Sequence, residues 1–314
     1  MKKAIKRLLK KIFILILVVF AIYLVFTNIS FFRDLAGKDS ISMIIDTDSG
    51  RDLNDILAIV RVMNDPDVKI EGLLSAQWRL SDPENDSTVM LNDNLNHLIL
   101  QHFNLPSIPN LRGENLPLQY KDPGKKIPIS PASSYILKRA SEAPYGEKLN
   151  IICLGPVTNL ASALEKDPSM AQKIKCYMIG PSYDAARRIW NKNEVNTRLD
   201  LDAMDILFNN EDLEMYVMPS NVAESFTLNK LQNRDLFQQK DSLFRLIHSR
   251  ITEDPGDVDH ISASSLALIQ AIINPEMSSQ NQVVTPPENT QRKIHVFTNI
   301  DPIRMEKDWL NIME

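Results

Sequence analysis

Four carboxylates lie close together between Asp46 and Asp55, in the segment D-T-D-S-G-R-D-L-N-D. They follow a short apolar run that ends at Ile45 and precede a stretch with helical periodicity. Carboxylates at this density repel one another unless a cation compensates them. Oxygen ligands alone suit a hard ion such as Ca²⁺ or Mg²⁺ better than Zn²⁺. The segment therefore predicts a divalent-cation site, in which Gly50 permits a tight turn.

Two other interpretations of this segment stay open. Aspartate is favoured at helix N-termini, so capping would account for one of the four carboxylates but hardly for all of them. An aspartyl phosphotransferase also places D-x-D after its first strand, and it would further need a downstream lysine and an acidic Mg²⁺ motif. The nearest match to such a motif, at residues 256–259, has poor spacing.

Apolar runs and amphipathic stretches alternate along the chain and must position these acids. Strands are predicted over residues 42–45, 68–75, 149–154, 173–179 and 293–298, helices over 55–63, 88–103 and 160–164, and loops over 121–131 and 278–290. Strands separated by helices predict an α/β fold with a doubly wound, mostly parallel sheet flanked by helices. Polar residues that directly follow a strand then lie at the carboxyl edge of the sheet, where ligands bind in such folds.

The N-terminus differs in composition from the rest of the chain. Residues 1–11 carry six Lys or Arg, and residues 12–26 carry no charge. A basic flank before a long apolar run predicts a transmembrane helix, with a cleaved signal peptide as the second interpretation. We therefore expect a membrane anchor or signal segment over residues 1–32 and one folded domain over 40–314. In an anchored protein that domain would lie on the outer side of the membrane; a cleaved, secreted form is the alternative.

Composition narrows the class of protein. A hydrophobic fraction of 44% with 24% charged residues is ordinary for a globular chain. The net charge of −5 argues against a nucleic-acid partner, which usually requires a basic surface. Cys153 and Cys176 lie in apolar runs, so they are predicted to be core residues and not part of a disulfide framework.

Five sequence blocks together resemble the inosine–uridine preferring nucleoside hydrolase family. The D-T-D-x-G opening at Asp46 is followed, in the same order as in the family, by matches at residues 112–118, 154–160, 173–180 and 194–203. The loop that contains Asp52 is two residues longer and resembles a bacterial subgroup. The resemblance implies the nucleoside hydrolase fold, with one Ca²⁺ at the bottom of a ribose pocket.

The resemblance also implies a role for each matching position around the ion. Asp48 would bind Ca²⁺ and accept a proton from its bound water, and Asp55 would be a second carboxylate ligand. Thr158 would ligate through its backbone carbonyl. Asp46 and Asp52 would support the cluster. A metal-bound water is easier to deprotonate, so this arrangement would activate water for attack on an anomeric carbon.

The residues expected to contact the substrate lie in other blocks. Glu194 and Asn196 would hold ribose hydroxyls. Gln77 and Trp78 follow the second predicted strand, roughly where the family places another ribose-binding residue. Trp78 could stack on a base, although a single tryptophan is more often a packing residue.

Two positions depart from the family pattern. Asn54 stands where the family has an acid that accepts a bond from the ribose 2′-hydroxyl, and an amide lacks the strength that charge adds. Ser265 stands where the family has a late metal-binding Asp, and a hydroxyl is a weak substitute for a carboxylate. His260 is a candidate for a substrate or leaving-group contact; the competing interpretation is an ordinary surface histidine.

These observations predict hydrolysis of the N-glycosidic bond of ribonucleosides or related ribosides by a Ca²⁺-bound water that Asp48 activates. The alternative is a catalytically impaired family member that binds ribosides or sugars outside the cytoplasm. The expected partners are a small nucleoside or riboside and, through the N-terminal segment, a membrane. A homodimer or homotetramer is also expected from the resemblance.

Overall fold

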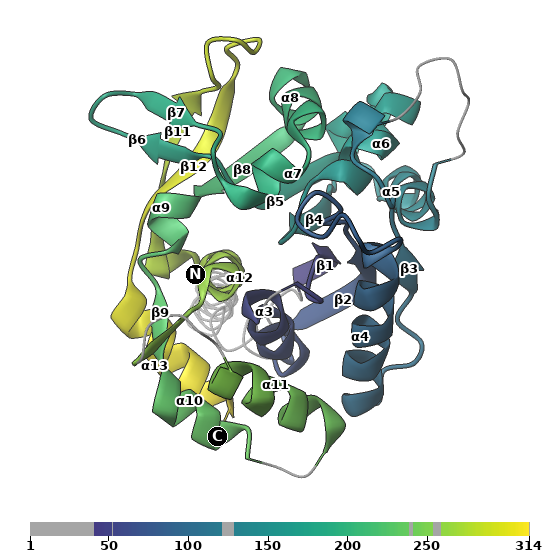
Figure 1. Ribbon diagram of the computed structural model, residues 1–314. Helices are drawn as coiled ribbons and strands as arrows, with labels where there is room; N and C mark the ends of the chain where they lie inside the picture. Colours follow the sequence, from purple (N-terminus) through teal and green to yellow (C-terminus); the bar gives the residue numbers. More distant parts are fainter. Residues whose placement is uncertain (1–40, 52, 121–128, 239–240, 254–258, 314) are drawn as a thin grey trace, which may run out of the picture. The chain divides into compact units, whose positions relative to one another are not determined.

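The computed structural model describes residues 41–51, 53–120, 129–238, 241–253 and 259–313 (Figure 1). Residues Ser42–Glu314 form one compact unit. The expected membrane or signal segment at residues 1–32 lies outside the described residues, and so does Asp52.

An eight-stranded sheet forms the centre of this unit, in the order β11-β12-β8-β5-β4-β1-β2-β3 (Figure 1). The pairs from β12 to β1 and the pair β2–β3 are parallel, whereas β11 is antiparallel to β12. Because the strand order reverses at β1, the doubly wound, mostly parallel sheet expected from the sequence is confirmed. The strands are β1 (Ile41–Thr47), β2 (Val68–Ser75), β3 (Asn110–Arg112), β4 (Leu149–Cys153), β5 (Ile174–Gly180), β8 (Glu214–Pro219), β11 (Ser278–Val284) and β12 (Lys293–Ile300).

Helices flank the sheet in two groups. Contacts join α6 to α5 and α8 in one group, and α3, α12 and α13 in the other. The helices are α3 (Asn54–Met63), α4 (Thr88–His102), α5 (Pro131–Glu142), α6 (Thr158–Lys166), α7 (Val195–Leu199), α8 (Leu201–Asn209), α9 (Ser220–Ala223), α10 (Lys230–Leu236), α11 (Ser242–Glu253), α12 (Ser264–Ile273) and α13 (Pro302–Met313). Two small antiparallel sheets pair β6 (Ser182–Asp184) with β7 (Ile189–Asn191) and β9 (Thr227–Asn229) with β10 (His260–Ser262).

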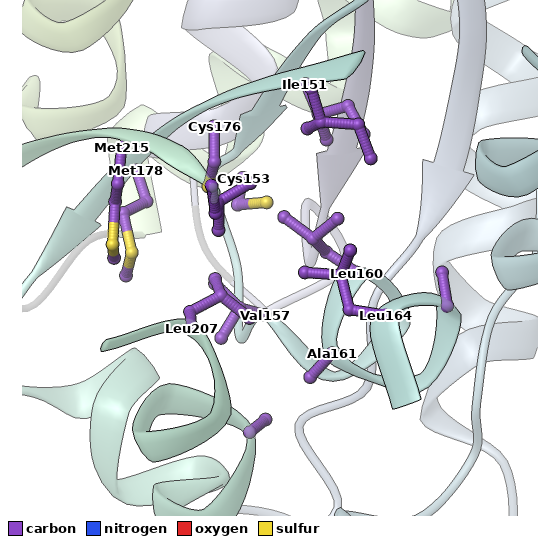
Figure 2. Packing of buried hydrophobic residues seen from close by; sticks show 14 of the residues in the cluster. Ile151, Cys153, Val157, Leu160, Ala161, Leu164, Cys176, Met178, Leu207 and Met215 are labelled. Atoms are coloured by element: carbon purple, nitrogen blue, oxygen red, sulfur yellow. The ribbon is translucent and has the colours of Figure 1, made fainter. Parts of the chain in front are cut away.

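The central strands are apolar because both faces of the sheet are covered, as parallel sheets require. Ile151 and Cys153 of β4 pack in one cluster with Cys176 and Met178 of β5 and with α6 (Figure 2). Both cysteines are free and buried, which confirms their prediction as core residues.

The helices and strands predicted from the sequence agree well with the observed ones at the centre of the sheet and poorly at its C-terminal edge. The ends of the eight predicted helices and strands differ from the observed ends by no more than two residues. The loop predicted over 278–290 is wrong in its first half, which forms edge strand β11. This strand reads S-S-Q-N-Q-V-V and is largely exposed, so it lacks the apolar alternation that identifies a strand. Its backbone pairing with β12 forms it instead.

The membrane-anchored localisation expected from the sequence is corrected. Within the described parts of the chain, no helix is both long and apolar enough to cross a membrane. The apolar run that suggested an anchor falls in residues 1–32, outside those parts.

Candidate functional site

The acidic segment lies at the carboxyl edge of the sheet, beside the point where the strand order reverses. The backbone amide of Leu154, just after β4, donates to the carbonyl of Asp46 (2.8 Å), and Ala76, just after β2, donates to that of Thr47 (2.8 Å). The ends of β1, β2 and β4 are thus held together. In open α/β sheets this crevice is where ligands bind.

Asp55, in the first turn of α3, is the centre of a buried hydrogen-bond network. One carboxylate oxygen accepts from the Thr47 hydroxyl (2.6 Å) and the Asp48 amide (3.1 Å). The other accepts from the Ser265 hydroxyl (2.7 Å). The network therefore joins the end of β1, the start of α3 and the start of α12, which packs against α3.

Asp48 is nearly fully buried and pairs with Arg51. The Arg51 Nε donates to Asp48 Oδ2 at 2.8 Å, while the Arg51 side chain keeps 26% of its surface exposed. On the other side of Asp48, a Cβ atom at Gly155 would lie 2.9 Å from Oδ1. Only a glycine allows the turn after β4 to come this close to the carboxylate.

Asp46 is fully buried and has a supporting position. Its Oδ1 accepts from the Asn159 amide at 2.8 Å, and its Oδ2 has no hydrogen-bond partner in the described chain. Burial is the main cause that raises the pKa of Asp46 to about 7. The Asn159 bond opposes this rise and the neighbouring Asp55 carboxylate adds to it.

The loop between Asp48 and α3 is held from two sides. The Asn92 side chain of α4 accepts from the Gly50 amide (2.6 Å), and Arg250 of α11 donates to the Ser49 carbonyl (2.9 Å). A Cβ atom at Gly50 would lie 2.6 Å from the Trp78 ring, so this glycine permits close packing. Trp78 is buried here, which agrees with the packing interpretation of that residue.

Thr158 and Gln77 lie in a second buried network. The Thr158 hydroxyl donates to Asp200 (2.8 Å) and accepts from the Gln77 amide (3.2 Å), and Gln77 also donates to the Leu199 carbonyl (3.3 Å). Asp200 in turn caps α8 by accepting from the Ala203 amide. The side chains of Thr158, Gln77 and Asp200 are thus all bonded within the protein, and these bonds fix the turn after β4.

A cavity of about 190 Å³ opens beside the acidic segment. Five residues expected from the sequence line it, and so does Arg51. The lining residues are Arg51, Asn54, Asp55, Leu154, Ile179, Glu194, Val195, Asn196, Ser220, Glu224, Ser262, Ser264 and Ser265. Six described positions expected from the sequence are not among them: Asp46, Asp48, Gln77, Trp78, Thr158 and His260. His260 is exposed on β10. Asp48 is bonded to Arg51, which does line the cavity.

Glu194 and Asn196 form the part of the cavity wall at the start of α7. The Glu194 carboxylate accepts from the amides of Asn196 and Thr197, each at 2.8 Å. Burial raises the pKa of Glu194, against the effect of these bonds and of Arg51. Asn196 donates to the Leu154 carbonyl (2.7 Å), and its Oδ1 has no hydrogen-bond partner among the described residues. That oxygen is available to accept from a bound hydroxyl.

Some residues that line the cavity were not predicted from the sequence. Arg51 is a single cation inside an acidic segment, which could have marked it as a site residue, but its contact with Asp48 depends on how the loop closes. Ser262 and Glu224 carried none, because they come from β10 and the end of α9, far along the chain. Asn54 was expected to face a ribose hydroxyl; its Oδ1 accepts from the Ser264 amide at 3.2 Å.

The donor set around Asp48 does not fit the calcium ion that the resemblance implies. Ca²⁺ takes 6–8 oxygen ligands at about 2.3–2.6 Å. One Asp48 oxygen is bonded to Arg51, and both Asp55 oxygens accept bonds from protein donors, one of them Ser265. Across the described ranges, no group of three or more His, Cys, Asp or Glu is arranged to hold a metal.

Comparison with known proteins decides the family. The model of the inosine-uridine preferring nucleoside hydrolase family matches residues 43–284. The chain belongs to this family. Its members are hydrolases that act on N-glycosyl compounds, which is the class expected from the sequence.

Individual relatives are similar over part of their length. Uridine nucleosidase 1 of Arabidopsis thaliana is 26% identical over 226 residues, which cover 65% of this chain and 62% of that protein. Probable uridine nucleosidase 1 of Oryza sativa is 29% identical over 186 residues, or 53% of this chain and 54% of that protein. The chain thus spans less than two thirds of these relatives. Both come from plants, so the expected bacterial subgroup is not supported.

A solved structure agrees on the fold. A plant nucleoside hydrolase has a TM-score of 0.68 at 18% identity, over 87% of this chain and 99% of that one. At this identity the likeness establishes the nucleoside hydrolase fold alone.

Proposed function

We propose that this protein hydrolyses the N-glycosidic bond of a ribonucleoside or close riboside in the cavity beside Asp48. The observation that carries the proposal is the grouping of carboxylates there. Asp55 and Glu194 line the cavity, and Asp48 lies beside it, paired with Arg51. Family membership supports the same reaction class.

Carboxylates at this place suit the chemistry of glycosidic cleavage. As the bond to the base breaks, the sugar gains oxocarbenium character, and nearby negative charge stabilises it. Asp48 accepts one proton of the attacking water as the water oxygen bonds to the anomeric carbon, and the departing base takes up a proton from solvent. A positioned base contributes about 10²–10⁴-fold in rate. Asp55, whose two oxygens are fixed by Thr47 and Ser265, contributes charge and not proton transfer.

The cavity wall provides groups that hold a sugar. Asn196 Oδ1 accepts from a ribose hydroxyl, and the Glu194 carboxylate does the same with the added strength of a charged acceptor. Two such contacts fix the ring relative to Asp48, which supplies proximity and orientation. Uridine is the first nucleoside to assay, since the plant relatives are named for it.

Calcium, which the resemblance implies, takes part in no step of this proposal. Arg51 is bonded to one Asp48 oxygen, and Thr47 and Ser265 are bonded to the two Asp55 oxygens, so with Arg51 in place a calcium ion would have to displace these donors. The expected homodimer or homotetramer stays a prediction that rests on the resemblance alone.

A synthetic riboside tests the ribosyl chemistry separately from base recognition. We expect the full-length chain to release p-nitrophenol from p-nitrophenyl β-D-riboside, whose activated leaving group needs no contacts to a base. Asp48→Asn should lower kcat by roughly 10²-fold or more, because it removes the base. Asp202→Asn, at an exposed aspartate on α8, is the matched control and should retain activity. Activity that survives Asp48→Asn would contradict the role given to Asp48.

A further inference from the structure

Arg51 occupies the position beside Asp48 where a cation is required. Its Nε lies 2.8 Å from Asp48 Oδ2, and Asp48 itself is only 2% exposed. A carboxylate that is this buried needs a compensating charge close by. The guanidinium supplies that charge, because it stays protonated at any physiological pH.

The second carboxylate is satisfied without an ion. Asp55 accepts bonds from Thr47 and Ser265 and from the Asp48 amide, at 2.6–3.1 Å. Hydrogen bonds to a carboxylate stabilise its charged form, as a metal would. A divalent cation placed between Asp48 and Asp55 would have to displace these donors and would be repelled by Arg51.

Arg51 also lines the cavity, together with acceptors from other elements. The same cavity is lined by Glu194 and Asn196, whose oxygens suit hydroxyl donors. A guanidinium carries five N–H donors in a planar fork, so it can hold a carboxylate and donate to a ligand oxygen together. The cavity thus offers donors and acceptors to a neutral ligand with several hydroxyls.

We propose that Arg51 replaces the divalent cation in this pocket: its guanidinium compensates Asp48 and donates to a sugar hydroxyl, and the site works without calcium. The inference rests on the proposed function for the identity of the ligand as a riboside. Its claim about calcium rests on the contacts of Arg51, Asp48 and Asp55.

Calcium binding tests this claim without any need for turnover. The chelator-treated full-length chain would be compared with Arg51→Ala, Arg51→Lys and Arg198→Ala by thermal unfolding in millimolar CaCl₂ and in EDTA. Arg198 is an exposed arginine on α7 and is not among the residues lining the cavity, so Arg198→Ala is the matched control. Direct calcium titration by calorimetry would give the stoichiometry.

We expect the unmodified chain, Arg51→Lys and Arg198→Ala to unfold within about 1 °C of the same midpoint with and without calcium. Arg51→Ala should unfold earlier in EDTA and recover by roughly 3 °C or more in calcium, since an ion that binds the folded state stabilises it. If Arg51→Ala does not fold, Ser265→Asp combined with Arg51→Gln replaces it, and calcium should restore its folding.

Three results would overturn the inference. One is a calcium-dependent rise in the midpoint of the unmodified chain, and another is one calcium bound per chain with Arg51 in place. The third is an unfolding midpoint of Arg51→Ala that calcium raises by no more than it raises the midpoint of Arg51→Lys. Failure of the proposed function looks different: the chain would be indifferent to calcium and would not release p-nitrophenol.

Discussion

At the scale of single residues, the pocket combines buried acids with few charges to compensate them. Asp48 is paired with Arg51, Asp55 is held by hydroxyls, and Asp46 is shifted towards its neutral form by burial. Glu194 is the acid with the clearest link to ligand binding, because it both lines the cavity and carries a raised pKa.

The raised pKa of Glu194 predicts a pH dependence of binding. A glutamate of ordinary pKa stays charged down to pH values near 4.5, whereas Glu194 becomes protonated at a higher pH. We expect the KM for p-nitrophenyl β-D-riboside to rise as the pH falls through that range, because the charged acceptor is lost. Glu194→Gln should have a high KM at every pH and lack this rise, as measured in quenched assays. An unchanged profile in Glu194→Gln would assign the dependence to another group.

Residue types alone predicted where this site lies but not its contacts. The spacing of the acids from Asp46 to Asp55 predicted a divalent-cation site after the first strand. The structure brings Asp46, Asp48 and Asp55 to the edge of the sheet, but the contacts of Asp48 and Asp55 do not fit that ion. The positions of Arg51 and Ser265 show the limit of such reasoning. Asp55 and Ser265 are 210 residues apart, and only the packing of α12 against α3 brings their side chains into contact.

At the scale of elements, the starts of α3 and α12 act as one unit. The bond from Ser265 to Asp55 joins them, and the Asn54 side chain accepts from the Ser264 amide. The sequence predicted α3 from its apolar periodicity. It implicated the start of α12 only through the family resemblance at Ser265, as a metal-binding position and not as a hydrogen-bond donor to Asp55. Edge strand β11 was not predicted for a related reason. It forms through pairing with β12, and its own sequence lacks the alternation of apolar and polar residues that identifies a strand.

Ser265→Ala should therefore destabilise the fold. It removes a buried hydrogen bond to a charged group, and such bonds contribute about 1.5–3 kcal/mol. We expect the free energy of unfolding, measured by urea titration, to fall by about 2 kcal/mol. Ser264→Ala is the control, because within the described part of the chain the Ser264 hydroxyl bonds only to the exposed Ser262. This change should cost less than about 0.5 kcal/mol. Equal losses for the two variants would argue against the network around Asp55.

At the scale of the whole molecule, the fold brings distant parts of the chain to one crevice. The cavity takes residues from the loop after β1, the turn after β4, the start of α7, the end of α9 and the start of α12. A doubly wound sheet does this because parallel strands end at one edge. The mostly parallel, doubly wound sheet followed from βαβ alternation. The contributions of α9 and β10 to the cavity depend instead on how the later segments of the chain fold over that edge.

The most direct test of this account is the fate of uridine and inosine incubated with the full-length chain, with free base and ribose measured by chromatography. The account predicts equal amounts of base and ribose from at least one of the two nucleosides, with and without EDTA. A folded chain that releases neither base nor ribose, in calcium or in EDTA, would contradict the proposed hydrolysis.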